Sequence, residues 1–167
     1  MGRLDEVGRR FELPSAPTPS EELAPQPESG IARCAVDDLY RGAVLYIEDN
    51  LANLKLVKRV LAPRQIEFLS TTRGEDGVRL AKEAHPDLIL LDLHLPYFWG
   101  DEVLRRLREA RATRDVPVVM LSADATQHQI DRLLAAGAHS YMTKPMDCRR
   151  LIEMVDEILK KEALAHA

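Results

Sequence analysis

The sequence contains few of the residues that mark disulfide-linked, zinc-binding or membrane-spanning proteins. Only two of its 167 residues are cysteines, Cys34 and Cys148, and neither belongs to a C-x-x-C motif. A disulfide framework or a cysteine zinc site is therefore not expected, and a reducing cytoplasm suits the chain. No apolar run approaches the roughly 20 residues of a membrane helix, and the N-terminus does not resemble a signal peptide.

The chain also lacks an excess of positive charge. Its formal net charge is −4, its pI is near 5.8, and lysine and arginine form no block or stripe. A nucleic-acid-binding function is not expected, because such proteins neutralise phosphates with clustered basic residues. Hydrophobic residues make up 46% of the sequence, which is enough for the buried core of one domain.

The composition changes near residue 42. Residues 13–30 read LPSAPTPSEELAPQPESG, and a segment so rich in proline, serine and glutamate buries too little apolar surface to order itself. We therefore predict that residues 1–41 are a largely flexible linker or tail. Residues 42–167 are predicted to form the folded domain.

From residue 43 onward, short apolar runs alternate with segments of helical periodicity. The apolar runs are AVLYIE from Ala43, IEFLS from Ile66, DLILLD from Asp87, VPVVMLS from Val116 and HSYMT from His139. In the segments that follow each run, apolar residues recur at spacings of three and four, which is typical of helices with one buried face. Pro63 is expected to end the first helix, and Gly137 suits the C-terminal cap of the fourth.

Continuous apolar strands that alternate with helices indicate a parallel sheet covered on both faces. Five such units predict an α/β fold with a doubly wound, flavodoxin-like sheet in the strand order 2-1-3-4-5. The binding crevice of such a sheet lies at the carboxyl ends of its strands, so the residues at those ends are the candidates for function.

Polar residues stand at the carboxyl ends of four of the five predicted strands: Glu48, Asp49 and Asn50 after the first, Asp92 on the third, Ser122 on the fourth, and Thr143, Lys144 and Pro145 after the fifth. Each residue alone also fits a helix cap, a turn or a solvated loop. The functional interpretation rests on their joint occurrence at one edge of the sheet.

The electrostatics of that edge indicate a phosphoryl site. Glu48, Asp49 and Asp92 would repel one another, so at least one carboxyl pKa should rise unless a cation compensates. Ligands that are all oxygen favour Mg²⁺. Lys144 adds an ammonium group and Ser122 a hydroxyl donor. Such groups around one carboxylate would stabilise the charge on the oxygens of a transferring phosphoryl group.

The segments VLYIEDN, LILLDLHLP, PVVMLSA and YMTKP closely resemble, in the same order, the site motifs of the receiver domains of two-component signalling. The resemblance begins at about residue 43 and runs to the C-terminus. It implies that Asp92 accepts a phosphoryl group from a phosphohistidine of a histidine kinase or histidine phosphotransfer protein. It implies that Mg²⁺ is bound by Glu48, Asp49, Asp92 and the backbone carbonyl of His94.

The resemblance further implies how the domain would respond. Ser122 and Lys144 would contact phosphoryl oxygens, and Lys144 would precede Pro145 in a cis peptide. Ser122 and Tyr141 occupy the switch positions, through which phosphorylation changes the surface of the fourth helix, fifth strand and fifth helix. A receiver catalyses only its own phosphorylation and dephosphorylation. Receivers often pair through the fourth and fifth helices, which leaves a homodimer of that kind open.

The N-terminal residues Phe11-Glu12-Leu13-Pro14 are similar to the end of a histidine-kinase ATPase domain. The chain is therefore interpreted either as a stand-alone regulator or as the C-terminal receiver of a hybrid kinase. Three aromatic residues, Tyr97-Phe98-Trp99, depart from the acidic, methionine-containing turn that receivers commonly have there. We expect them to pack over the loop, and a docking patch for a partner is the alternative. His94 and Asp124 occupy variable positions that tune dephosphorylation in this family.

Other functions fit parts of the pattern. A haloacid-dehalogenase-type phosphatase also uses a strand-end aspartate, but it needs a second aspartate where this chain has His94. A flavin-binding domain of the same topology would need a phosphate loop, and Ser70-Thr71-Thr72-Arg73-Gly74 follows the second strand rather than the first. A degenerate receiver used only for dimerisation is less compatible with the presence of Asp49, Asp92, Ser122 and Lys144.

Overall fold

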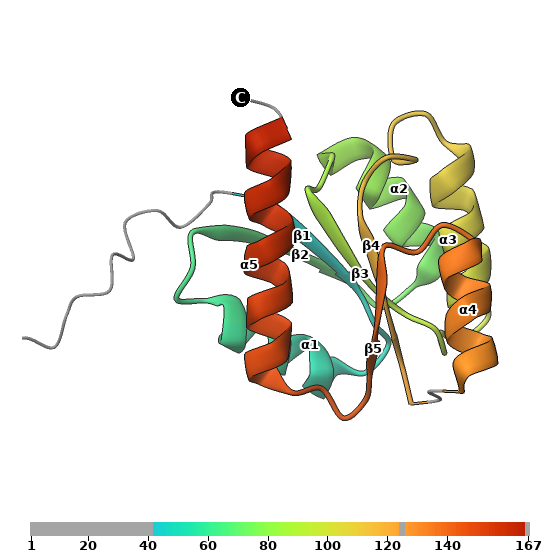
Figure 1. Cartoon of the computed structure of the whole chain (residues 1–167), viewed down its shortest axis with the longest axis horizontal. Coiled ribbons are helices and arrows are strands. Elements are labelled where there is room, and N and C mark those ends of the chain that lie inside the picture. Colours follow the sequence, from blue (N-terminus) through green and yellow to red (C-terminus); the bar gives the residue numbers. More distant parts are fainter. Residues whose placement is uncertain (1–41, 124–125, 166–167) are drawn as a thin grey trace, which may run out of the picture. The chain divides into compact units, whose positions relative to one another are not determined.

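The computed structural model describes residues 42–123 and 126–165. In these residues, strands and helices alternate along the chain (Figure 1). The elements are β1 (Gly42–Ile47), α1 (Leu51–Leu61), β2 (Ile66–Thr71), α2 (Gly74–Ala84), β3 (Leu88–Asp92), α3 (Gly100–Glu109), β4 (Val118–Ser122), α4 (Gln127–Ala135), β5 (Ser140–Thr143) and α5 (Cys148–Ala165).

The strands form one parallel sheet in the order β2-β1-β3-β4-β5. The predicted α/β fold and strand order are thereby confirmed, and each predicted apolar run overlaps one of the strands. The central strands β3 and β4 are buried along their whole length. A strand that is buried on both faces has no side chains facing solvent, which explains why DLILLD and VPVVMLS are nearly continuous apolar runs.

Helices cover both faces of the sheet. On one face, α1 and α5 contribute Leu54, Val57, Leu151 and Val155 to a core cluster. On the other face, α2, α3 and α4 lie against a second cluster that includes Ala81, Leu104 and Leu133. Figure 1 shows α1 and α5 on one side of the sheet and the remaining helices on the other.

Local signals set the helix ends. The Asn50 side chain caps α1 by accepting from the backbone N–H of Ala52 at 2.9 Å, so the capping interpretation of this residue is right. α1 ends at Leu61, just before Pro63, as predicted. Gly137 follows α4 with a φ of +98°, a left-handed conformation that glycine adopts without steric cost.

None of the helices in the described part of the chain is long and apolar enough to cross a membrane. The interpretation of residues 1–41 as a flexible linker, and that of Phe11-Glu12-Leu13-Pro14, fall outside the described residues. The same holds for the interpretation of Asp124.

Candidate functional site

The carboxyl ends of β1, β3, β4 and β5 bring the polar strand-end residues to one edge of the sheet. Glu48 and Asp49 follow β1, and Asp92 is the last residue of β3. Carboxylate oxygens of these three residues all lie within 4.8 Å of one another. Glu48 and Asp92 are buried, with exposures of 1% and 4%, whereas Asp49 is exposed. The structure thus places three negative charges in one small, partly buried volume.

Lys144 joins the two buried carboxylates. Its Nζ lies 2.6 Å from Glu48 Oε2 and 3.0 Å from Asp92 Oδ2. The backbone of Lys144 is fixed beside β4, because the Lys144 N–H donates to the carbonyl of Ser122 at 2.8 Å. The peptide bond between Lys144 and Pro145 is cis. The cis peptide expected from the resemblance is therefore present. One ammonium group neutralises only part of the charge of three carboxylates.

Backbone hydrogen bonds fix the Asp92 carboxylate and the residue that follows Asp92. The carboxylate oxygen Oδ1 accepts from the backbone N–H of His94 at 3.2 Å, and the N–H of Leu93 donates to the carbonyl of Leu121 on β4 at 2.9 Å. Burial raises the pKa of Asp92; Lys144 lowers it and Glu48 raises it, and the resulting pKa lies above the usual range. The ionised carboxylate is therefore under electrostatic stress without a further cation.

Glu48 has a different balance. Burial raises its pKa, but the Lys144 ammonium and the Tyr46 hydroxyl together lower it below the usual range. The Tyr46 hydroxyl donates to Glu48 Oε2 at 2.5 Å. Tyr46 was missed in the sequence. The available signal was a hydroxyl-bearing side chain inside an otherwise apolar strand, two residues before the acidic pair.

Comparison with known proteins decides the family. The sequence model of the response regulator receiver domain matches residues 44–156. The chain belongs to the response regulator receiver family. The polar-differentiation response regulator DivK of Brucella ovis is 34% identical over 117 residues, which make up 70% of this chain and 95% of DivK. The chain is thus a receiver domain of two-component signalling, and neither the phosphatase nor the flavin-binding alternative is supported.

Solved receiver structures share its fold. The receiver domain of a Francisella response regulator has a TM-score of 0.68 at 26% identity, covering 72% of this chain and 98% of its own. The receiver domain of a sensor histidine kinase from Pseudomonas aeruginosa has a TM-score of 0.65 at 28% identity, covering 71% and 98%. That second protein was solved with a magnesium ion coordinated in its active-site cleft.

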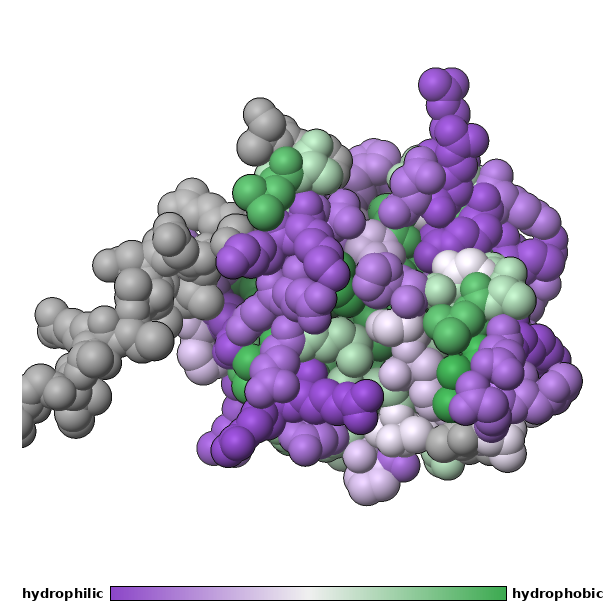
Figure 2. Space-filling model, in the orientation of Figure 1, coloured by the Kyte–Doolittle hydropathy of each residue, from purple (hydrophilic) through white to green (hydrophobic). Residues whose placement is uncertain are grey.

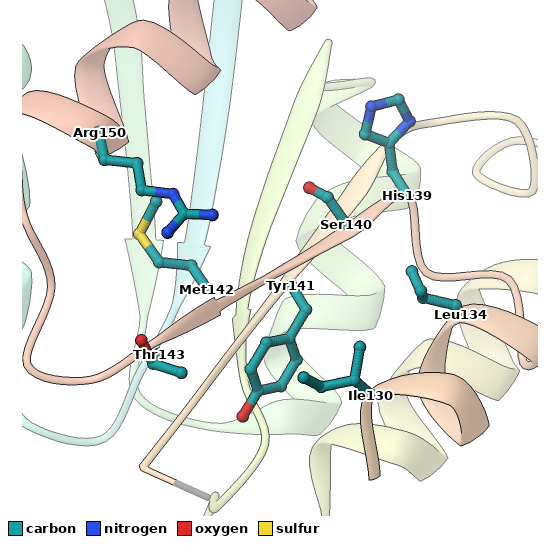
Figure 3. Close-up of a pocket in the computed structure, with 8 residues that line it drawn as sticks. All are labelled: Ile130, Leu134, His139, Ser140, Tyr141, Met142, Thr143 and Arg150. Atoms are coloured by element: carbon teal, nitrogen blue, oxygen red, sulfur yellow. The ribbon is translucent and has the colours of Figure 1, made fainter. Parts of the chain in front are cut away.

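The two predicted switch residues of this receiver lie on neighbouring strands. Ser122 is fully buried at the end of β4 and pairs with Thr143 of β5. Tyr141 lies on β5, partly buried against the core cluster that α2, α3 and α4 cover. Its ring extends toward Ile130 of α4 (Figure 3). The Tyr141 ring therefore connects β5, the strand that leads to Lys144, with α4.

A groove of 360 Å³ lies beside Tyr141. Ile130 and Leu134 of α4 form one side, and Arg150 of α5 lies opposite (Figure 3). Leu134 is 42% exposed, and Figure 2 shows apolar surface over α4. The groove belongs to the surface of α4, β5 and α5 through which the resemblance expects a receiver to signal.

The aromatic loop after β3 differs from the expectation that all three rings pack over the loop. Phe98 does pack against the core cluster, and the Arg106 guanidinium lies 4.2 Å from its ring centroid. Tyr97 is wholly exposed, and Trp99 is 62% exposed. The packing interpretation is therefore right for Phe98 and wrong for Tyr97. Trp99 meets it in part, because its ring contacts His94 of the same loop while most of its surface is exposed.

The His94 imidazole contacts Trp99 edge-on, with ring centroids 5.8 Å apart. Within the described residues, the candidate metal-binding group consists of Glu48, Asp49 and Asp92 and contains no imidazole. The His94 side chain is thus part of the aromatic loop, while its backbone N–H orients the Asp92 carboxylate.

Gly100 sets how closely α3 approaches Asp92. A Cβ at this position would lie 2.3 Å from the carbonyl oxygen of Asp92 and 2.7 Å from Leu93 Cα. Both are backbone atoms, which cannot rotate away as a side chain can. Glycine is therefore required where α3 begins beside the end of β3.

We expect Gly100→Ala to lower the free energy of unfolding by about 2–3 kcal/mol, because the overpacked backbone must shift. Denaturant unfolding followed by circular dichroism measures this loss. Gly74→Ala is the matched control. Gly74 is also the first residue of a helix, but the three atoms nearest to its added Cβ belong to side chains, the nearest being Val103 Cγ2 at 2.8 Å. Equal losses in the two variants would contradict the assignment of the effect to the Asp92 backbone.

Proposed function

We propose that this receiver is a phosphoryl-accepting switch of a two-component phosphorelay, with Asp92 as the acceptor. The observation that carries the proposal is the position of the Asp92 carboxylate, 3.0 Å from the Lys144 ammonium and within 4.8 Å of the carboxylates of Glu48 and Asp49. A nucleophilic oxygen, an amine and a cation-binding group at one sheet edge are the parts that phosphoryl transfer requires.

The residues at this edge fit Mg²⁺. Three carboxylates face the single positive charge of Lys144, and a hard divalent cation with oxygen ligands would compensate the remainder. We infer that Glu48, Asp49, Asp92 and the backbone carbonyl of His94 hold the ion, directly or through water. When bound, Mg²⁺ would neutralise charge on the phosphoryl oxygens. The magnesium-bound receiver from Pseudomonas aeruginosa supports this choice of ion.

In the proposed reaction, an Asp92 oxygen attacks the phosphorus atom of a partner's phosphohistidine. The new P–O bond to Asp92 forms as the P–N bond breaks, and the imidazole leaves with the electron pair of that bond. The Lys144 ammonium and the Ser122 hydroxyl would then bind oxygens of the transferred group. Lys144 already contacts Asp92, so a short movement would bring it to the phosphoryl oxygen.

The acyl phosphate would act on a two-state surface. The Ser122 hydroxyl would follow the phosphoryl group and Tyr141 would turn toward the space that it leaves, which changes the surface of α4, β5 and α5. The groove beside Tyr141 supports this route, because it lies on that surface. Proposed partners are a histidine kinase or histidine phosphotransfer protein, and homodimerisation through α4 and α5 is a further proposed state.

The proposed receiver domain spans residues 42–167, follows the segment 1–41 and acts in the cytoplasm. It would catalyse only its own phosphorylation and dephosphorylation.

The proposal is tested by incubating the protein with Mg²⁺ and a small phosphodonor, either acetyl phosphate or phosphoramidate, which has the P–N bond of phosphohistidine. We expect one phosphoryl group per chain in intact-mass spectra, loss of labelling with EDTA, and assignment of the label to Asp92 by peptide mapping. Labelling that does not need a divalent cation, or that maps to a serine or histidine, would overturn the proposal.

A further inference from the structure

Tyr46 is an unusual residue for the middle of a buried strand. Its neighbours in β1, Val44, Leu45 and Ile47, are apolar and fully buried, and Tyr46 is fully buried as well. Its ring belongs to the core cluster beneath α1 and α5. A tyrosine in such a place brings a hydroxyl group into the core, and that group needs a hydrogen-bond partner.

The partner of this hydroxyl is an oxygen of the phosphoryl site. Tyr46 Oη donates to Glu48 Oε2 at 2.5 Å, and the same oxygen accepts from Lys144 Nζ at 2.6 Å. The other carboxylate oxygen, Oε1, accepts from the backbone N–H of Asn50 at 3.3 Å. Glu48 Oε2 thus accepts from a fixed donor in the core and from an ammonium at the end of a flexible side chain. The Glu48 carboxylate also makes a hydrogen bond with the Asn53 side chain.

On phosphorylation, the Lys144 ammonium would have to move from Glu48 toward a phosphoryl oxygen. As the contact between Lys144 and Glu48 weakens, Oε2 loses one of its donors, and the Glu48 side chain is only 1% exposed. A buried acceptor that loses its only donor carries the full cost of its desolvation. With the Tyr46 hydroxyl in place, the Glu48 oxygen keeps one donor throughout.

We infer that Tyr46 is a positioning residue of the phosphoryl site. Its hydroxyl holds the Glu48 carboxylate in orientation and allows Lys144 to leave that carboxylate for the phosphoryl group. This inference rests on the proposed function. The alternative is that Tyr46 only fills the core and that Glu48 happens to satisfy its hydroxyl, in which case the hydroxyl has no effect on phosphorylation.

Tyr46→Phe distinguishes the positioning role from the core-filling role, because it removes the hydroxyl and keeps the ring. We expect labelling by acetyl phosphate at saturating Mg²⁺ to be about ten-fold slower, as for the loss of one hydrogen bond to a charged group. Binding of beryllofluoride, a phosphoryl mimic, should weaken by a similar factor. Tyr97→Phe is the matched control, since it removes the hydroxyl of a wholly exposed tyrosine and should leave both values unchanged.

A double-variant cycle with Glu48→Gln tests whether Tyr46 acts through Glu48. The neutral amide no longer holds the ammonium by charge, so adding Tyr46→Phe in this background should slow labelling by less than about two-fold. A disturbance of core packing would instead carry over unchanged into the Glu48→Gln protein. Equal effects of Tyr46→Phe in the two backgrounds would therefore overturn the positioning role.

The hydrogen bond itself is observable without the cation. In metal-free protein, proton NMR should show a slowly exchanging hydroxyl signal that is absent in Tyr46→Phe. The signal should persist when Mg²⁺ and beryllofluoride are added, because Tyr46 keeps Glu48 in the activated state. Its loss on activation would overturn the inference, as would wild-type labelling rates in Tyr46→Phe. Failure of the wild-type protein to label would instead overturn the proposed function.

Discussion

Replacing Asp92 with asparagine is expected to abolish labelling by acetyl phosphate and to stabilise the metal-free protein at neutral pH. The amide of asparagine is not a phosphoryl acceptor, so the first effect should be complete. The second effect follows from charge, because the substitution removes one of three carboxylates whose oxygens lie within 4.8 Å of one another. The amide oxygen of asparagine is still able to accept from Lys144.

The sign of the stability change follows from the pKa of Asp92. Burial first, and Glu48 second, raise that pKa against the opposing effect of Lys144. A carboxyl group with a raised pKa in the folded state binds its proton more tightly there than in the unfolded chain. The ionised form therefore destabilises the fold at neutral pH. This cost shrinks as the pH falls through the folded-state pKa and is gone below the unfolded-state pKa. The advantage of Asp92→Asn should be present at neutral pH and absent in acid.

Intact-mass spectrometry and denaturant unfolding in EDTA measure the two effects. Asp131→Asn is the control, because Asp131 lies exposed on α4 and accepts from Gln127 Nε2 at 2.7 Å. It should change neither labelling nor stability. Labelling that survives in Asp92→Asn would place the acceptor elsewhere. A metal-free Asp92→Asn protein less stable than wild type would contradict the repulsion argument.

Replacing Lys144 with methionine is expected to lower the free energy of unfolding of the metal-free protein by about 3 kcal/mol. Methionine keeps the unbranched shape and removes the charge. The ammonium lies 2.6 Å from Glu48 and 3.0 Å from Asp92, whose side chains are 1% and 5% exposed. Without it, two buried carboxylates lose their shared counter-charge, and such uncompensated buried charges are costly.

Magnesium should restore much of this loss. The cation would bind the same carboxylates and replace the missing positive charge, so Mg²⁺ should stabilise Lys144→Met more than it stabilises the wild-type protein. Thermal or denaturant unfolding, with EDTA and then with a Mg²⁺ titration, measures both values.

Lys161→Met is the matched control for this prediction. Lys161 makes an ion pair with Glu157 at 2.7 Å, but both side chains are more than half exposed. Exposed ion pairs of this kind contribute little, so this variant should unfold like the wild-type protein with or without Mg²⁺. If Lys144→Met loses no more stability than Lys161→Met, the Lys144 ammonium does not compensate the buried carboxylates.

The sequence alone determined the architecture and the family. The alternation of apolar runs with helical periodicity is a local property of the sequence. The burial of each run is therefore predicted from its own residues alone. Parallel pairing then places all strand ends on one edge, which is why the sequence alone predicts that Glu48, Asp49, Asp92 and Lys144 lie close together. Pro63 and Gly137 marked helix ends for equally local reasons.

The tertiary structure decided how those groups contact one another. Lys144 and Glu48 are 96 residues apart in the chain, and their hydrogen bond depends on side-chain conformations that no local pattern encodes. The sequence shows Tyr46 only as an aromatic residue within an apolar strand, and its hydrogen bond to Glu48 is visible only in the folded structure. The three aromatic residues of the loop also differ in burial. Phe98 packs against the core cluster, whereas Tyr97 and Trp99 are exposed. Periodicity fixes the face on which a side chain lies, whereas its contacts depend on packing among elements distant in sequence.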